Sequence, residues 1–210
     1  QLEGIRSAVI PSLVGPEIQT SLFAEFATAA SEVWQLGATM LPGDLQGLDY
    51  ATMILACYGV REPRSAARAR VDRFDPKISR RVLVTRTALD IARFLQPGLA
   101  QDDENDQIRP VRALEQCIAT GADRLRKYGD SYRLGFFDPD EPGDRGAVEN
   151  FVVFDGNRIL TETFGLVTEL SDPRVVRLFT QNFESVWSAC LLDGDAVDAM
   201  QRVIAAYGGD

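Results

Sequence analysis

A chain of 210 residues is long enough to bury a substantial hydrophobic core, in one domain or in one domain with a sizeable appendage. Its composition, 45% hydrophobic and 25% charged, is that of a globular protein, and its net charge of −9 argues against a large nucleic-acid footprint, which needs clustered Lys and Arg. The absence of histidine excludes histidine bases, histidine metal ligands and histidine nucleophiles.

Metal sites, cofactors and membrane spans find no support in the sequence. Cys57, Cys117 and Cys190 stand far apart in apolar helical contexts, so we interpret them as small buried hydrophobes in a reducing compartment. The acidic run Asp102–Asp106 lacks the alternating ligands and internal Gly of a calcium loop. No stretch reaches the roughly 18 apolar residues of a membrane span. We therefore expect a cytoplasmic protein with no metal and no cofactor.

The N-terminal part has a helical pattern. Apolar residues recur at helical spacing from Pro16 to Trp34, so we predict a helix that stops near Gly37. An extended segment, Thr39–Gly43, ends in a Pro-Gly turn, and residues 44–55 resume helical spacing. We predict a helical N-terminal segment over residues 1–62 and an α/β domain over residues 63–210.

A basic run extends from Arg61 to Arg81 in this otherwise acidic chain. Its helical part has Arg at the spacing of a solvated face, and contact with DNA or an acidic partner is the alternative.

A strand, a helix and a second strand follow this run. Arg81–Thr85 is short and rich in β-branched residues, which is typical of a strand buried on both faces. A helix begins at Pro110 and ends at Gly129, and Ser131–Phe137 is a strand with aromatic side chains. Residues 98–106 and 138–146 are surface loops. A helical crossover predicts that the two strands are parallel.

The clearest local signals lie between residues 147 and 192. Two apolar runs meet at Asp155-Gly156-Asn157, a hairpin turn, and Gly165–Leu170 is a further strand. Ser171 or Asp172 can cap a helix that begins at Pro173 and runs to about Leu192. A last helix covers Asp195–Tyr207. The predicted fold is α/β (α+β), with a mixed sheet flanked by helices and preceded by the helical N-terminal segment.

The stretch from Met40 to Ala51, MLPGDLQGLDYA, resembles a known signature. The signature, vPGLLQT-DYAR, opens the C-terminal domain of many XRE-type helix-turn-helix regulators of high-GC actinobacteria, often encoded beside small antitoxin-like partners. The resemblance implies a non-catalytic domain of a transcription regulator, and we expect its DNA-binding helix-turn-helix upstream of this chain. Four positions depart from the family pattern: Asp44 replaces a Leu, Gly47 a Thr, Thr52 an Arg, and Arg86 the Glu after the first strand.

The hairpin region is also similar to the second half of a phospholipase-D-like unit. Asp155 matches the Asp of that pattern and Thr163 its Ser, but Val148 replaces the His and Asn150 the Lys. The nucleophile of that chemistry is the histidine, so the resemblance implies the scaffold without the phosphodiesterase reaction.

We therefore predict an effector-binding or dimerisation domain of a homodimeric regulator, in which a ligand shifts the population competent for DNA. Strand ends would supply the ligand contacts, and the predicted residues are Arg86, Tyr132, Phe136, Arg158 and Thr163. The alternative for these residues is local ion pairing and core packing.

The second hypothesis is a protein-interaction module without a small-molecule ligand. In it the segment from Met40 to Tyr58 and the N-terminal helix present an apolar surface to a small partner or a second copy. The predicted contacts are Leu41, Leu45 and Tyr50.

Overall fold

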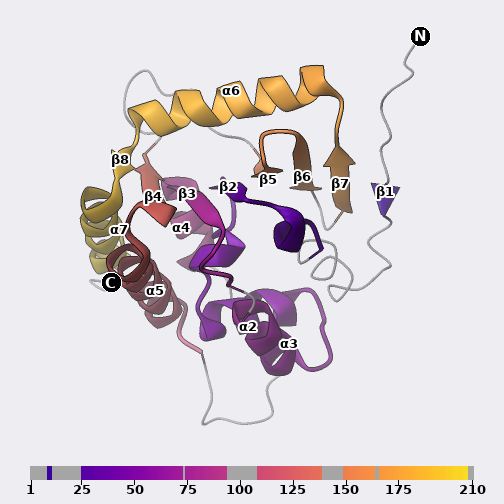
Figure 1. Cartoon of the computed structure of the whole chain (residues 1–210). Helices are drawn as coiled ribbons and strands as arrows, with labels where there is room; N and C mark the ends of the chain where they lie inside the picture. Colours follow the sequence, from indigo (N-terminus) through magenta and orange to yellow (C-terminus); the bar gives the residue numbers. More distant parts are fainter. Residues whose placement is uncertain are drawn as a thin grey trace.

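The computed structural model describes residues 9–10, 25–72, 74–93, 108–138, 149–163 and 166–207. Residues 25–29 are helical. The elements shown in Figure 1 are, in chain order, β1 (Val9–Ile10), β2 (Glu32–Gly37), η1 (Gly43–Leu45), α2 (Leu48–Cys57), α3 (Pro63–Val71), β3 (Ser79–Thr85), α4 (Arg86–Arg93), α5 (Pro110–Tyr128), η2 (Gly129–Ser131), β4 (Tyr132–Phe137), β5 (Asn150–Phe154), β6 (Arg158–Thr163), β7 (Leu166–Leu170), α6 (Pro173–Ala189), β8 (Leu191–Leu192) and α7 (Asp193–Tyr207).

The described strands form one mixed sheet in the order β1-β7-β6-β5-β2-β3-β4-β8. β2, β3 and β4 are parallel to one another, while β5, β6, β7 and β8 join by antiparallel pairing. The predicted α/β fold with a mixed sheet flanked by helices is confirmed. The parallel pairing predicted from the helical crossover is confirmed too, since β3 pairs with β4.

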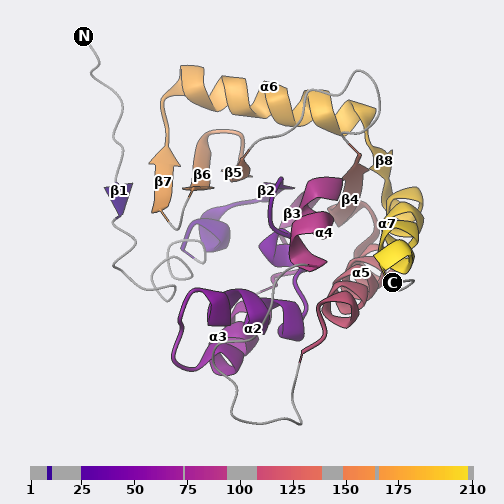
Figure 2. The same cartoon turned by 180° about the vertical axis from the view of Figure 1, so that it is seen from behind.

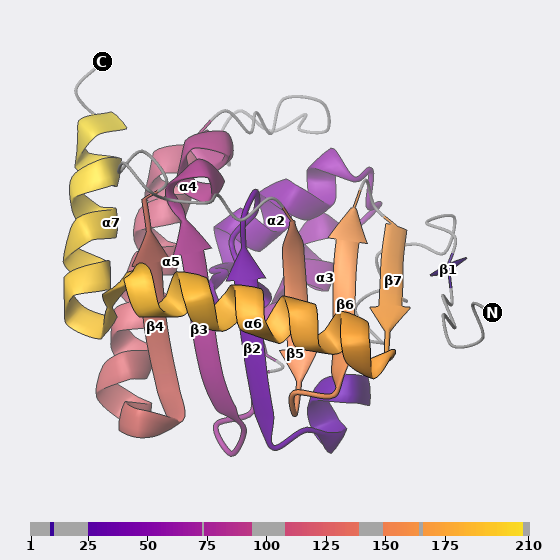
Figure 3. The same cartoon turned by 90° about the horizontal axis from the view of Figure 1, so that it is seen from above.

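Helices cover both faces of the sheet. Figure 3 shows α6 crossing the strands on one face, where Phe183 stacks on Trp34 at 5.3 Å and meets Phe151 edge-on. Figure 2 shows α2, α3 and α5 on the opposite side. There the core includes Val82 and Leu134 of the sheet and Leu114 of α5, all fully buried. None of the described helices has the length and apolarity needed to span a bilayer.

The helix predicted from Pro16 to Trp34 is wrong at its C-terminal end, where the structure has strand β2. Residues 16–24 lie outside the described residues, and Glu32–Gly37 is a strand between β5 and β3. Val33 and Leu36 pack into different clusters on the two faces of the sheet. A strand buried on both faces has no polar alternation, so its apolar residues also match helical spacing. Because β2 pairs with β3, the sheet extends across the boundary predicted at residue 62.

Two other helix boundaries differ from the prediction. The helix predicted over residues 44–55 is interrupted: η1 ends at Leu45, Gln46 is extended, and α2 begins at Leu48. The helix predicted to Leu192 ends at Ala189, because Cys190 is extended and Leu191–Leu192 forms β8 against β4. The predicted loop over residues 98–106 and the loop residues 139–146 lie outside the described residues.

The predicted hairpin turn is confirmed between β5 and β6. Asp155 and Gly156 have φ of 48° and 64°, the positive values that a tight hairpin turn requires. Asp155 Oδ1 accepts hydrogen bonds from the Ser31 N–H at 2.9 Å, the Ser31 hydroxyl at 2.8 Å and the Glu32 N–H at 2.9 Å. The turn is therefore joined to the start of β2.

We expect Asp155→Ala to lower the free energy of unfolding by about 1–2 kcal/mol, the loss typical of an Asp that caps backbone N–H groups. Burial alone would raise the pKa of Asp155, but the donors of Ser31 and Glu32 outweigh it and hold the pKa below its ordinary value. The charge-dependent stabilisation is thus complete above about pH 3.9 and is lost as the pH falls through the lowered pKa. Urea unfolding at several pH values measures both effects.

The control is Asp155→Asn, which keeps the Oδ1 acceptor and tolerates positive φ. It should retain most of the stability and lose the pH dependence attributable to this carboxylate. A loss equal to that of Asp155→Ala would contradict the assignment of the effect to the Oδ1 hydrogen bonds.

Candidate functional site: a cavity beside the segment from Leu41 to Gln46

A cavity of about 250 Å³ lies on the sheet face opposite α6. Its floor includes Gln35, Val152 and Leu160, which are paired in one row across β2, β5 and β6. The walls come from two parts of the chain: the motif residues from Met40 to Gln46, and five residues at and after the end of α3, namely Arg70, Val71, Phe74, Asp75 and Ile78. Further residues that line it are Ala27, Thr28, Leu36, Arg80, Arg124, Asn150, Phe151 and Thr161.

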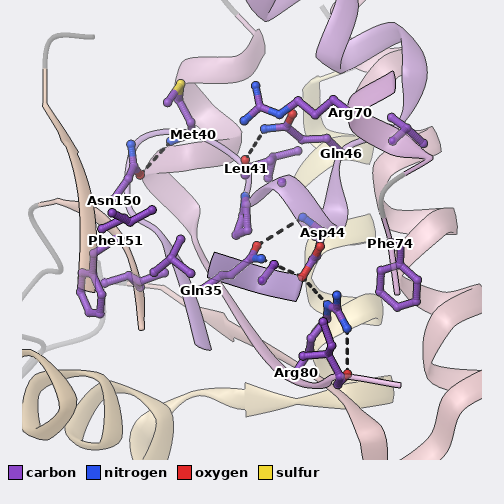
Figure 4. Close-up of a pocket in the computed structure, with 18 of the residues that line it drawn as sticks. Gln35, Met40, Leu41, Asp44, Gln46, Arg70, Phe74, Arg80, Asn150 and Phe151 are labelled. Carbon is purple, nitrogen blue, oxygen red and sulfur yellow. Dashed lines mark hydrogen bonds and ion pairs between the residues drawn. The ribbon is translucent and has the colours of Figure 1, made fainter. Parts of the chain in front are cut away.

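Asn150 holds the chain that leaves β2 (Figure 4). Its Oδ1 accepts from the N–H groups of Ala38, Thr39 and Met40 at 2.8, 2.9 and 3.3 Å, and its Nδ2 donates to Thr39 Oγ1 at 2.8 Å. Figure 4 draws the bond to Met40. These bonds link residues more than a hundred positions apart. Asn150, which stands where the phospholipase-D-like pattern has Lys, therefore fixes one wall of the cavity.

Asp44 and Arg80 form a buried ion pair in the cavity wall. Arg80 Nε donates to Asp44 Oδ2 at 2.7 Å, and the two side chains are 3% and 11% exposed. Gln35 Nε2 donates to the same oxygen at 2.7 Å, and Gln35 Oε1 accepts from the Asp44 N–H at 3.2 Å. Arg80 Nη1 also donates to the carbonyls of Asp75 and Ile78. The pair is thus neutral and well hydrogen-bonded.

Two other polar groups of the lining have an atom without a protein hydrogen bond. Gln46 is 2% exposed; its Nε2 donates to the Leu41 carbonyl at 2.7 Å, while its Oε1 has no donor. Arg124, on α5, lies 3.8 Å above the Phe74 ring, and its buried Nη1 has no acceptor. Unmet hydrogen-bonding capacity in a buried site is costly unless another molecule satisfies it.

The five predicted ligand-binding residues are not brought together, and none lines this cavity. Arg86 opens α4 and pairs with Asp138 at 3.0 Å, while Arg158 pairs with Glu169 at 3.2 Å at the start of β6. Tyr132 and Phe136 are buried in the core on β4. Thr163 ends β6, and its side chain lies outside the described residues. Their role as ligand contacts stays a prediction.

The three predicted partner contacts, Leu41, Leu45 and Tyr50, are buried within this chain at 2%, 0% and 1% exposure. Tyr50 also accepts a hydrogen bond from the Leu41 N–H at 3.1 Å, and burial raises the pKa of its phenol. In this arrangement Leu45 and Tyr50 belong to the core behind the cavity wall, and Leu41 lines the cavity itself.

The polar residues of the cavity were missed by the sequence interpretation. Arg80 appears in the sequence only as a member of the basic run from Arg61 to Arg81, and no pattern singles out Arg124 or Gln35. Asp44 was visible only as a departure from the family signature, where an apolar Leu is usual. The negative charge of Asp44, at a position where the signature has an apolar residue, was the one sequence signal that could have indicated a buried ion pair.

The fold and the cavity define an α/β protein with a mixed sheet and a partly polar cavity. No protein-family model and no curated protein matches the chain. Among solved structures, TrmBL2, an archaeal chromatin protein with a novel mode of DNA binding, is 16% identical over 81% of this chain, with a TM-score of 0.39. This chain spans 48% of that protein. Nuc from Salmonella typhimurium, a phospholipase D family member, is 9% identical over 84% of this chain and 92% of its own, with a TM-score of 0.38. Both similarities are distant.

Proposed function

We propose that this chain is a non-catalytic, ligand-sensing domain of a transcription regulator and that the effector binds in the cavity. The observation that carries the proposal is the cavity itself, which is built on the motif from Met40 to Gln46 and is lined by two residues, Gln46 and Arg124, that each have a buried hydrogen-bonding atom without a protein partner. A concave, mainly apolar site with a few polar groups is the usual form of a small-molecule site. The regulator assignment rests on the resemblance of that motif.

The absence of catalysis is part of the proposal. The chain has no histidine, and two positions that align with the phospholipase-D-like pattern make structural hydrogen bonds: Asn150, which replaces its Lys, and Asp155, which matches its Asp. Asn150 holds the chain after β2, and Asp155 holds the start of β2. The Asn150 amide cannot transfer a proton at neutral pH, and Asp155 Oδ1 is occupied by three donors.

Sensing would operate through the walls of the cavity. The floor belongs to the sheet, whereas the walls belong to the segment from Met40 to Gln46 and to the end of α3. A ligand that contacts all three binds one relative arrangement best and stabilises it. An upstream DNA-binding domain would respond if its own packing depended on that arrangement.

The proposal is tested by differential scanning fluorimetry and calorimetry with a panel of small organic acids, amides, amines and nucleobases. At least one probe should raise the unfolding midpoint, because a molecule that binds only the folded state stabilises it. Val152→Phe places a larger side chain on the cavity floor and should abolish that shift.

Leu178→Phe is the matched control, since Leu178 is 65% exposed on α6, which covers the other face of the sheet. It should leave the shift unchanged. No shift with any probe, or a shift that persists in Val152→Phe, would overturn the ligand-sensing function.

A further inference from the structure

The charges that line the cavity are unlike those of the whole chain. The chain has a net charge of −9, but the lining includes three arginines, Arg70, Arg80 and Arg124, and two aspartates, Asp44 and Asp75. Asp44 is neutralised by Arg80 at 2.7 Å. The lining therefore has an excess of positive charge inside an acidic protein, which favours an anionic ligand.

Arg124 is the lining cation that has a buried N–H group without an acceptor. Arg80 uses its Nε on Asp44 and its Nη1 on two carbonyls. Among the residues that the structure describes, no carboxylate lies within 4.0 Å of the Arg124 guanidinium, and its buried Nη1 has no acceptor. Burial lowers the pKa of Arg124 and the nearby Arg80 charge acts in the same direction, while Tyr132 and Asp44 act against them. An anion bound at this position would favour the charged guanidinium.

The remaining lining sets the size and polarity of the ligand. Its floor and walls include the apolar side chains of Val71, Phe74, Val152 and Leu160. An apolar cavity of about 150 Å³ holds one benzene molecule. A volume of about 250 Å³ therefore suits a ring, or an aliphatic body of similar size, with one or two substituents.

Gln46 adds a second polar requirement. Its Nε2 is committed to the Leu41 carbonyl, which fixes the amide so that Oε1 is the unpartnered atom. A carbonyl oxygen only accepts hydrogen bonds, so its partner must be a donor. A hydroxyl on the ligand would satisfy it.

We propose that the cavity binds a small organic carboxylate with an apolar body and a hydrogen-bond donor, with the carboxylate on Arg124 and the apolar body against the sheet. This inference rests on the proposed ligand-sensing function and names its ligand class. A carboxylate can accept hydrogen bonds from the Arg124 guanidinium, whose Nη1 has no acceptor among the residues that the structure describes.

Isothermal titration with four probes tests the inference: para-hydroxybenzoate, benzoate, benzamide and benzylamine. We expect para-hydroxybenzoate to bind best, benzoate more weakly, and the neutral and cationic probes at least 10-fold more weakly than benzoate. A hydrogen bond to a charged group contributes about 1.5–3 kcal/mol, and each 1.4 kcal/mol is about tenfold in affinity. Arg124→Gln should therefore weaken benzoate about 10-fold or more and leave benzamide unchanged, while Arg124→Lys should restore part of the loss.

Arg126→Gln is the control, because Arg126 lies on the same helix, is 77% exposed and pairs with Asp123 outside the cavity. It should bind all four probes as the unmodified chain does. If benzamide or benzylamine bound better than the two carboxylates, and Val152→Phe abolished that binding, the carboxylate inference would be wrong. The proposed ligand-sensing function would still hold, because the cavity would still bind a ligand. Binding of none of the four overturns the inference as well, and the function fails only if the wider panel also gives no shift.

Discussion

Arg80→Met should lower the free energy of unfolding by about 3–5 kcal/mol, the range for removing one partner of a buried ion pair. The variant leaves the Asp44 carboxylate, only 11% exposed, without its counter-charge, and the carbonyls of Asp75 and Ile78 lose their donor. Urea unfolding followed by circular dichroism measures the loss.

Arg81→Met is the matched control on the neighbouring position of β3. The Arg81 side chain is 32% exposed and pairs with Glu184, which is 48% exposed. Exposed pairs of this kind contribute about 1 kcal/mol or less. The double variant Asp44→Asn with Arg80→Met should lose less than the sum of the single losses, because no buried charge remains. Equal losses for Arg80→Met and Arg81→Met would show that burial of the pair has no energetic consequence.

Local chemistry accounts for the elements that could be predicted. The hairpin at Asp155-Gly156 depends on residues that accept positive φ, and α6 begins where Asp172 caps the Arg174 N–H at 2.8 Å before Pro173. Both signals lie within a few residues of the structure that they specify. The parallel pairing of β3 and β4 followed from the helix between them, a rule of chain connection that needs no contact information.

Strand β2 could not be recognised from its own residues. Its neighbours, β3 and β5, come from later positions in the chain, and α6 buries Trp34 from one face. Until those elements are in place, nothing distinguishes an apolar run in a central strand from the buried face of a helix.

The cavity was less predictable than the fold, because its polar groups act in pairs that are distant in sequence. Asp44 and Arg80 are separated by 36 positions, and Asn150 is 112 positions from Ala38. Each residue alone matches a common role: Arg80 a solvated charge, Asn150 a turn residue or a degenerate catalytic position. In the folded chain Asn150, which replaces the lysine of the phospholipase-D-like pattern, fixes the cavity wall through its hydrogen bonds to residues 38–40.

Gly37→Ala should cost about 3 kcal/mol, at the upper end of the range for overpacking, because the added methyl group meets backbone. A Cβ at Gly37 would lie 2.3 Å from the Met40 carbonyl oxygen and 2.5 Å from Pro42 Cδ. Neither atom belongs to the end of a flexible side chain, so relief requires a shift of the segment that forms the cavity wall. The variant should therefore lose probe binding together with stability, which calorimetry and thermal unfolding measure on the same sample.

Gly43→Ala is the control within the same segment, because a Cβ there meets nothing within 4 Å. It should keep the unfolding midpoint. If Gly37→Ala melted like Gly43→Ala, the chain after β2 would be free to move, and Asn150 with its three backbone donors would not hold it. If Gly37→Ala were stable but had lost binding, the segment from Met40 to Gln46 would be needed for the ligand and not for stability. The position of this segment, and not the stability of the fold, would then determine whether the cavity can hold a ligand.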